Sequence, residues 1–229
     1  MYNVCVRPSG QLKVGVLVAL GLVLYGWLRF PHVSLLSLAG GVAILLIYGV
    51  AAKRFSALID DRSFTGNTVI MALALMAGCV FVGEVLLEYV VLPAANVMWG
   101  WVEFGLVFTI YFATGALCEL RRVPLRRSVQ AAVVVAMASS LLWYIAVLCC
   151  FFLFFGTERQ MAVFSAEGNY EDFRKSGMSN FSDFIMEDFY GAGFFHLLLG
   201  PLVASVLAAA GALAIRWSKI IAGTNSHSE

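Results

Sequence analysis

Three acidic side chains stand inside stretches of the sequence that are otherwise apolar. Glu84 and Glu88 lie four positions apart, which places both on one face of a helix, and Glu103 lies in the next apolar stretch. An ionised side chain costs at least a few kcal/mol in the hydrocarbon of a membrane, so such residues usually face a partner or a cavity. Because two carboxylates roughly 6 Å apart repel each other, we expect either Glu84 or Glu88 to carry a proton, or a cation to lie between them.

A histidine in the last apolar stretch is the fourth candidate. His196 opens a series of positions spaced by four, whose other members are all small: Gly200, Ala204, Ala208 and Ala212. Small residues at this spacing form a groove that another helix approaches closely, so we expect them to pack against a neighbour and His196 to face the protein. Pro201 should also free the carbonyl of Leu197 to bind a hydroxyl, a water or an ion.

These four side chains offer chemistry that suits positive charge. Carboxylates and an imidazole together can bind a divalent metal, pass protons or hold a cationic substrate. The spacing of Glu84 and Glu88 differs from the Glu-x-x-His unit of di-iron bundles, and His196 has no second histidine three or four positions away. The pattern therefore leaves any metal unknown, implies no cofactor and argues against a metalloenzyme. The alternative is structural: Glu88 and Glu103 reach water near the headgroups, and His196 holds helices together.

The composition explains why these residues stand out. The chain has 229 residues, of which 61% are hydrophobic and 13% are charged, whereas a soluble domain has about 25% charged residues. We therefore interpret residues 1–229 as one integral membrane domain whose first partner is the lipid bilayer. A formal net charge of +1 with no basic tract argues against nucleic acid as a partner. The five cysteines include no CxxC pair, which argues against a zinc site and a disulfide framework.

Six apolar segments are long enough to cross the roughly 30 Å of hydrocarbon in a bilayer. They run from about Leu12 to Leu28, Val33 to Ala52, Thr68 to Leu92, Val97 to Leu117, Val129 to Phe155, and Ala192 to Arg216. We therefore predict an all-α bundle of six transmembrane spans. In this topology Glu84, Glu88, Glu103 and His196 all fall in the half of the membrane opposite the termini.

Basic residues are unequally divided between the two sides of this topology. With six spans both termini lie on one side, and that side holds eleven of the fifteen Lys and Arg residues. Because cytoplasmic loops carry the excess of basic residues, we expect both termini to face the cytoplasm. We expect the membrane to be the plasma membrane of a bacterium.

Residues 157–190 form the one long connection, on the outer side. They hold seven acidic residues against three basic ones. Within this connection Phe181, Phe184, Ile185 and Phe189 recur at helical spacing, and Asn180 is suited to cap the helix. We predict a short amphipathic helix at the outer interface that leads into the sixth span, either as an anchor or as a gating or substrate-capture element.

Three functions remain open at this point. The first is a protein that binds or translocates a cation, a proton or a small solute through Glu84, Glu88, Glu103 and His196. The second is a non-catalytic accessory or scaffold subunit with a membrane-protein partner or further copies of itself. It predicts exposed small-residue faces, an outer connection with little packing of its own, and no internal cavity. The third is an intramembrane enzyme, which needs a nucleophile or a metal beside a base. The sequence shows no such pairing, so we expect no enzymatic activity.

Overall fold

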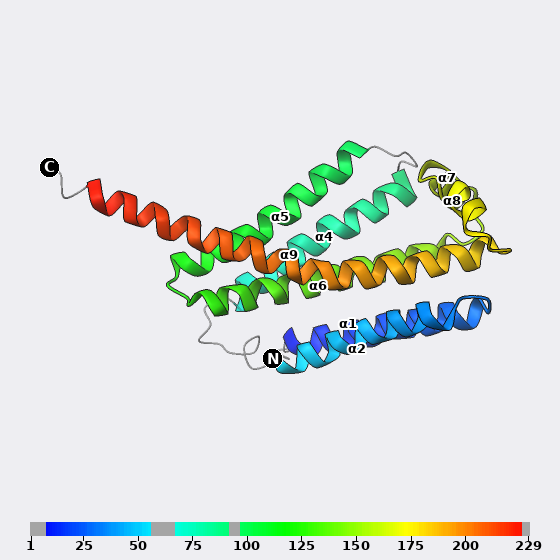
Figure 1. The fold of residues 1–229 in the computed structure, drawn as a ribbon, viewed down its shortest axis with the longest axis horizontal. Coiled ribbons are helices and arrows are strands. Elements are labelled where there is room, and N and C mark those ends of the chain that lie inside the picture. The colour runs from blue at the N-terminus through cyan, green and yellow to red at the C-terminus, as the bar shows by residue number, and fades with distance from the viewer. Residues whose placement is uncertain (1–7, 56–66, 92–96, 226–229) are drawn as a thin grey trace, which may run out of the picture.

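The computed structural model describes residues 8–55, 67–91 and 97–225, and these residues form helices with no strand. Six of the helices are long and apolar enough to cross a membrane. They are α1 (Pro8–Arg29), α2 (Leu35–Arg54), α4 (Asn67–Leu86), α5 (Val97–Leu120), α6 (Leu125–Leu153) and α9 (Phe181–Asn225) (Figure 1). The predicted all-α bundle of six spans is therefore confirmed, and the chain is an integral membrane protein.

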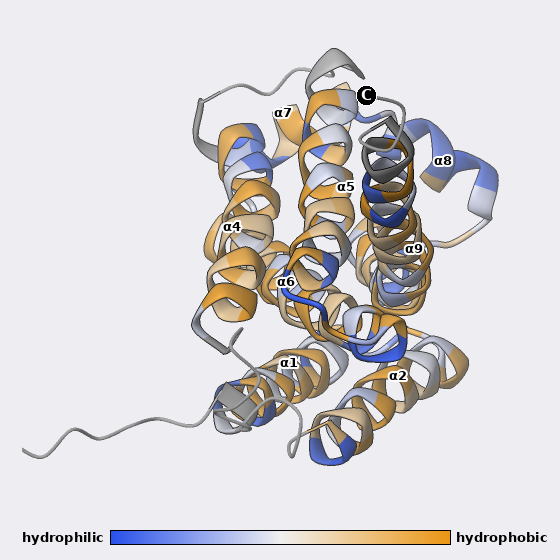
Figure 2. Ribbon diagram, turned by 90° about the vertical axis from the view of Figure 1, so that its left-hand side faces the viewer, coloured by the Kyte–Doolittle hydropathy of each residue, from blue (hydrophilic) through white to orange (hydrophobic). Residues whose placement is uncertain are grey.

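Helix α6 lies at the centre of the bundle. Figure 2 shows α4, α5 and α9 side by side on one side of α6, and α1 and α2 on the other. α6 contacts four of the other spans: α1, α4, α5 and α9. Accordingly, 67% of the apolar stretch of α6 is buried inside the protein, against 39% or less of the corresponding stretch in each other span. The remaining spans present large apolar faces outward, as lipid-facing helices do.

Successive spans run in opposite directions, so the start of α1 and the end of α9 lie at the same end of the bundle (Figure 1). The tight turn between α5 and α6 lies at this end and carries Arg121 and Arg122, and the first turn of α6 adds Arg126 and Arg127. Two short helices, α7 (Glu158–Ala166) and α8 (Asn169–Ser176), lie at the opposite end (Figure 1). The bundle therefore has a basic end and an end capped by the acidic connection.

The small residues of α9 pack against α5 and α6, as the sequence predicts. The alanines of the series, Ala204, Ala208 and Ala212, are fully buried. A methyl group added to Gly115 of α5 would overlap the backbone oxygen of Ala208, and one added to Gly211 would overlap that of Phe112. The backbones of α5 and α9 are thus in direct contact, and Gly200 lies against the side chain of Ser140 on α6.

The carbonyl group freed by Pro201 accepts a hydrogen bond from a hydroxyl group. Tyr48 of α2 donates a hydrogen bond of 2.6 Å to the backbone oxygen of Leu197, which confirms the predicted availability of this group. A second bond runs the other way, from the hydroxyl of Tyr190 on α9 to the backbone oxygen of Val23 on α1. Both tyrosines are buried. Together they fix the α1–α2 pair to α9 through main-chain oxygens.

The connection before the last span contains more structure than the sequence analysis expected. The amphipathic segment that begins at Phe181 is continuous with the last span, so that α9 has 45 residues. Asn180 caps its start, because Oδ1 of Asn180 accepts from the backbone amides of Ser182 and Asp183. The two short helices α7 and α8 precede it and are separated by Gly168, whose positive φ of 80° suits glycine. The outer end of the bundle is thus built of helices.

The contact between α5 and α9 predicts that two glycine substitutions in α5 differ in their effect on stability. Gly115→Ala should lower the stability of the folded protein by roughly 1–3 kcal/mol, because the added methyl group overlaps the backbone of α9. Gly105→Ala is the matched control, since a methyl group there meets no atom within 4 Å. Thermal unfolding in detergent measures the difference. Equal midpoints for the two variants would contradict the close contact.

The hydrogen bond to Leu197 predicts that Tyr48→Phe destabilises the protein. The substitution leaves the backbone oxygen of Leu197 without its donor at a buried site, which should cost about 0.5–2 kcal/mol. Tyr25→Phe serves as control, because Tyr25 lies on the outward face of α1 and is 52% exposed. A Tyr48→Phe protein as stable as the control would show that the proline site is satisfied in another way.

Candidate functional site

One pocket near the capped end of the bundle is lined by all four sequence-predicted side chains. Its volume is about 210 Å³, and it lies between α4, α5, α6, the segment after α7, and the start of α9. We call it the acidic pocket, after its five acidic residues: Glu84, Glu88, Glu103, Glu167 and Asp188. His196 and Trp143 complete the polar and aromatic part of the wall. The structure thus brings Glu84, Glu88, Glu103 and His196 together.

The end of α4 positions two of these acids. Glu84 lies in the last turn of the α-helix, and Glu88 lies in the π-helical segment η1 (Leu87–Val91) that follows it. A π-helical turn is wider than an α-helical one, and such turns are frequent at functional sites. Val85 and Tyr89, from the same two segments, are buried in the pocket wall. Both acids therefore face the pocket across a change in helix geometry.

Glu103 is the most deeply buried acid of the pocket. Its side chain is only 6% exposed, and among the described residues its Oε2 atom has no hydrogen-bond partner. The carboxyl group of Glu84, on the neighbouring helix α4, lines the same pocket and acts electrostatically on Glu103. Two neighbouring carboxylates repel each other unless one of them carries a proton or a cation lies between them. The sequence analysis expects this repulsion between Glu84 and Glu88, and the structure adds Glu103 of α5 as a further neighbour.

The ring of His196 is held in a fixed orientation. It stacks on Trp143 of α6 with ring centroids 3.9 Å apart and an angle of 16° between the planes. Phe81 of α4 meets it edge-on at 6.4 Å. Ala192, one turn earlier on α9, lines the pocket beside the imidazole. These contacts give the acidic pocket a rigid aromatic wall.

Sequence reasoning missed two of the five acids and the tryptophan. Glu167 directly follows α7 and Asp188 lies in the second turn of α9, so both belong to the connection that was interpreted as an interfacial segment. A signal for Asp188 was present: Asp188, Ala192 and His196 are spaced by four and share one helix face. Trp143 gave no signal, since an aromatic residue in an apolar helix is ordinary.

Glu167 lies at the mouth of the pocket and retains contact with solvent. The surrounding protein removes part of the water around its carboxylate, which raises the pKa of Glu167 above its ordinary value. The nearby carboxylates of Asp188 and Glu84 raise this pKa further, whereas a hydrogen bond of 2.8 Å from the side-chain amide of Asn169 opposes the shift. Crowding of negative charge thus extends from the membrane-spanning helices to the outer connection.

The acidic pocket does not present a metal-binding arrangement. Within the described ranges, no three His, Cys, Asp or Glu side chains converge closely enough to ligate one ion. Carboxylates that are spread around a cavity suit a proton, which needs one or two of them, or a polyatomic cation with dispersed charge. The geometry therefore favours these two ligand classes over a coordinated metal.

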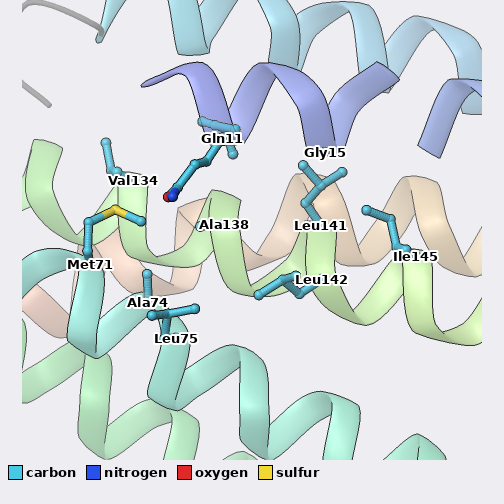
Figure 3. A pocket seen from close by; sticks show the side chains of 11 residues that line it. Gln11, Gly15, Met71, Ala74, Leu75, Val134, Ala138, Leu141, Leu142 and Ile145 are labelled. Carbon is cyan, nitrogen blue, oxygen red and sulfur yellow. The ribbon is translucent and has the colours of Figure 1, made fainter. Parts of the chain in front are cut away.

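Another pocket, between α1, α4 and α6, lacks such chemistry. Its volume is about 130 Å³, and the amide of Gln11 is the one polar side chain among the described residues that line it (Figure 3). The other walls are aliphatic, as Leu75, Leu141 and Ile145 illustrate. This pocket offers no acid, base or charge to a ligand, so it is not a candidate site.

The raised pKa of Glu167 predicts a change in how stability depends on pH. The folded protein holds the Glu167 proton more tightly than the unfolded chain, so this group stabilises the fold fully below pH 4.5, and the stabilisation is lost as the pH rises through the raised pKa. Glu167→Gln should therefore show a smaller fall in unfolding temperature between pH 4.5 and neutrality. Glu158→Gln, at an exposed acid of α7, is the control. Parallel curves for both variants and the unmodified protein would refute the assignment.

Comparison with known proteins adds no family to this description. No protein-family model, curated protein or solved structure matches the chain. The functional argument therefore rests on the chemistry of the acidic pocket.

Proposed function

We propose that this protein binds a proton or a cation in the acidic pocket and translocates it across the membrane. The observation that carries the proposal is Glu103. A carboxyl oxygen that is buried and lacks a hydrogen-bond partner in the described structure is costly, by about 1–3 kcal/mol. A proton or a cation bound in the pocket supplies the missing partner.

The charge of the pocket supports the same ligand class. Five acidic residues line it, and no lysine or arginine of the described chain is among its lining residues. Negative side chains confined in a low-dielectric wall raise the local concentration of cations and repel anions. A cation that enters would compete with protons for these carboxyl groups, so binding of the two would be competitive.

Translocation requires that the pocket become accessible from the basic end. The pocket lies towards the capped end, and α5 and α9 close the bundle below it through their backbone contact at Gly115 and Ala208. Passage therefore needs these two helices to separate or slide. Alternating access of this kind is how carriers expose one site to both sides of a membrane.

The two alternatives have less support. For an accessory subunit we expected exposed small-residue faces and a poorly packed outer connection. Instead α5 and α6 cover the small residues of α9, and α7 buries Val163 and Phe164.

For an intramembrane enzyme the pocket would need a nucleophile beside a base. The lining residues of the acidic pocket, as far as the structure describes it, include no serine, threonine or cysteine.

The proposed orientation follows from the two ends of the bundle. The end with both termini carries the arginines of the α5–α6 turn, and the other end carries the acidic connection. The excess of basic residues on cytoplasmic loops supports placing the termini in the cytoplasm, and we propose the plasma membrane of a bacterium as the location. In this orientation the acidic pocket collects its ligand from outside the cell.

Replacement of the buried acid tests the proposal. The purified protein should bind at least one of two probe cations, ammonium or tetramethylammonium, and lose the infrared band of a protonated carboxyl group as it does so. Glu103→Gln should lack that change and bind the same cation at least about 10-fold more weakly, because it cannot supply the negative charge. Calorimetric titration measures the affinity.

Glu171→Gln is the matched control, because Glu171 lies on α8 with its side chain 64% exposed and pairs with Lys175 at the surface. It should behave as the unmodified protein does. If Glu103→Gln kept both the affinity and the infrared change, or if the unmodified protein bound no probe cation and showed no carboxyl band that responds to pH, the proposal would fail.

A further inference from the structure

A second pocket lies about one to two helical turns deeper in the bundle than the acidic pocket. Its volume is about 260 Å³, and it shares Phe104 and His196 with the acidic pocket. We call it the aromatic pocket, after its five Phe and Tyr residues: Phe81, Phe104, Phe108, Tyr111 and Phe195. Because the two pockets have wall residues in common, they are adjacent, and a ligand that passes Phe104 and His196 would occupy both.

The aromatic pocket opens sideways between α5 and α9. These helices are in contact near Gly115 and Ala208 and diverge from there towards the capped end (Figure 1). Side chains on its rim are exposed, with Phe195 at 59% and Leu199 at 50%. Both lie within a membrane-spanning helix, so they face lipid. A hydrophobic molecule can therefore enter this pocket from the outer half of the bilayer.

The floor of the aromatic pocket leaves little for a polar ligand group to bind. The hydroxyl of Tyr111 already lies 3.1 Å from Oγ of Ser139, within hydrogen-bonding distance. No Asp, Glu, Lys or Arg of the described chain lines this pocket. Its walls therefore suit an aromatic or aliphatic group, while the acidic pocket above it suits positive charge.

We propose that the two pockets together bind a lipophilic organic cation, with its charged group in the acidic pocket and its apolar group in the aromatic pocket. This inference rests on the proposed function and adds a substrate class to it. Volumes of about 210 and about 260 Å³ place the joined site in the range typical of small-molecule ligands. At the junction, the stacked rings of Trp143 and His196 form an aromatic wall beside the charged group.

The same charges select against phospholipids, which also reach the site through the bilayer. A phosphate group would meet the carboxylates of the acidic pocket without a lysine or arginine among the described lining residues to offset the repulsion. A monovalent ammonium group meets only attraction there. The site therefore distinguishes a simple cationic amphiphile from a membrane lipid by charge.

Two quaternary ammonium ions test the inference on the unmodified protein in lipid nanodiscs. Tetramethylammonium fills only the acidic pocket, and benzyltrimethylammonium adds a phenyl group for the aromatic pocket. Calorimetric titration, corrected with empty nanodiscs, should show at least about 10-fold tighter binding of the benzyl compound. Benzyl alcohol, which lacks the charge, should not compete. Equal affinities of the two ammonium ions, or effective competition by benzyl alcohol, would overturn the inference.

A pair of tryptophan substitutions on α9 separates the two pockets. Leu199→Trp puts a bulky ring on the rim of the aromatic pocket, whereas Leu202→Trp is the control, because Leu202 is 56% exposed and does not line that pocket. Leu199→Trp should lose the benzyl advantage and keep tetramethylammonium binding. If both variants retained the advantage while Glu103→Gln abolished tetramethylammonium binding, the proposed function would stand and this inference would fall. If Glu103→Gln left tetramethylammonium binding intact, the proposed function itself would fail.

Discussion

The backbone contact between α5 and α9 is the constraint on which the rest of the structure depends. In lipid, helices gain little from burying apolar surface, so their association relies on close packing and hydrogen bonds. Gly115 and Gly211 allow this packing, since each lies where a side chain would overlap the facing backbone. From this contact α5 and α9 diverge towards the capped end (Figure 1). The space where they separate holds both pockets, and His196 lies one turn before Gly200, at the point where the small residues begin.

The contact between the α1–α2 pair and α9 shows how buried polar groups are satisfied between helices. Pro201 removes one hydrogen bond from α9 and frees the carbonyl of Leu197, and Tyr48 supplies a donor at 2.6 Å. The hydroxyl group of Tyr190 likewise donates a hydrogen bond to the backbone oxygen of Val23 on α1. At the basic end, Arg216 of α9 pairs with Glu119 of α5 at 2.8 Å. Each of these polar groups is matched by a partner from another helix, so the bundle is fixed at several depths.

Much of this arrangement follows from the sequence, because its strongest signals act within one helix. Apolar length predicts the spans, spacing by four predicts the small-residue groove, and Pro201 predicts the free carbonyl of Leu197. Four pocket residues stood out as polar groups in apolar surroundings. Trp143 and Glu167 did not, because their place in the pocket depends on how separate helices pack. Which acids become neighbours across helices could not be predicted either, because no local rule brings Glu103 of α5 beside Glu84 of α4.

Leu197 and Glu103 differ in how their buried oxygen atoms are satisfied. Both place an oxygen in the protein interior, and a single neighbouring hydroxyl satisfies the first. Oε2 of Glu103 receives no such donor from the part of the chain that the structure describes, although Trp143 and His196 form a nearby wall of the same pocket. A structural acid would be expected to resemble Glu119, which has an arginine partner. An acid whose missing partner is a bound cation or proton must instead lie beside a cavity, as Glu103 does in the wall of the acidic pocket.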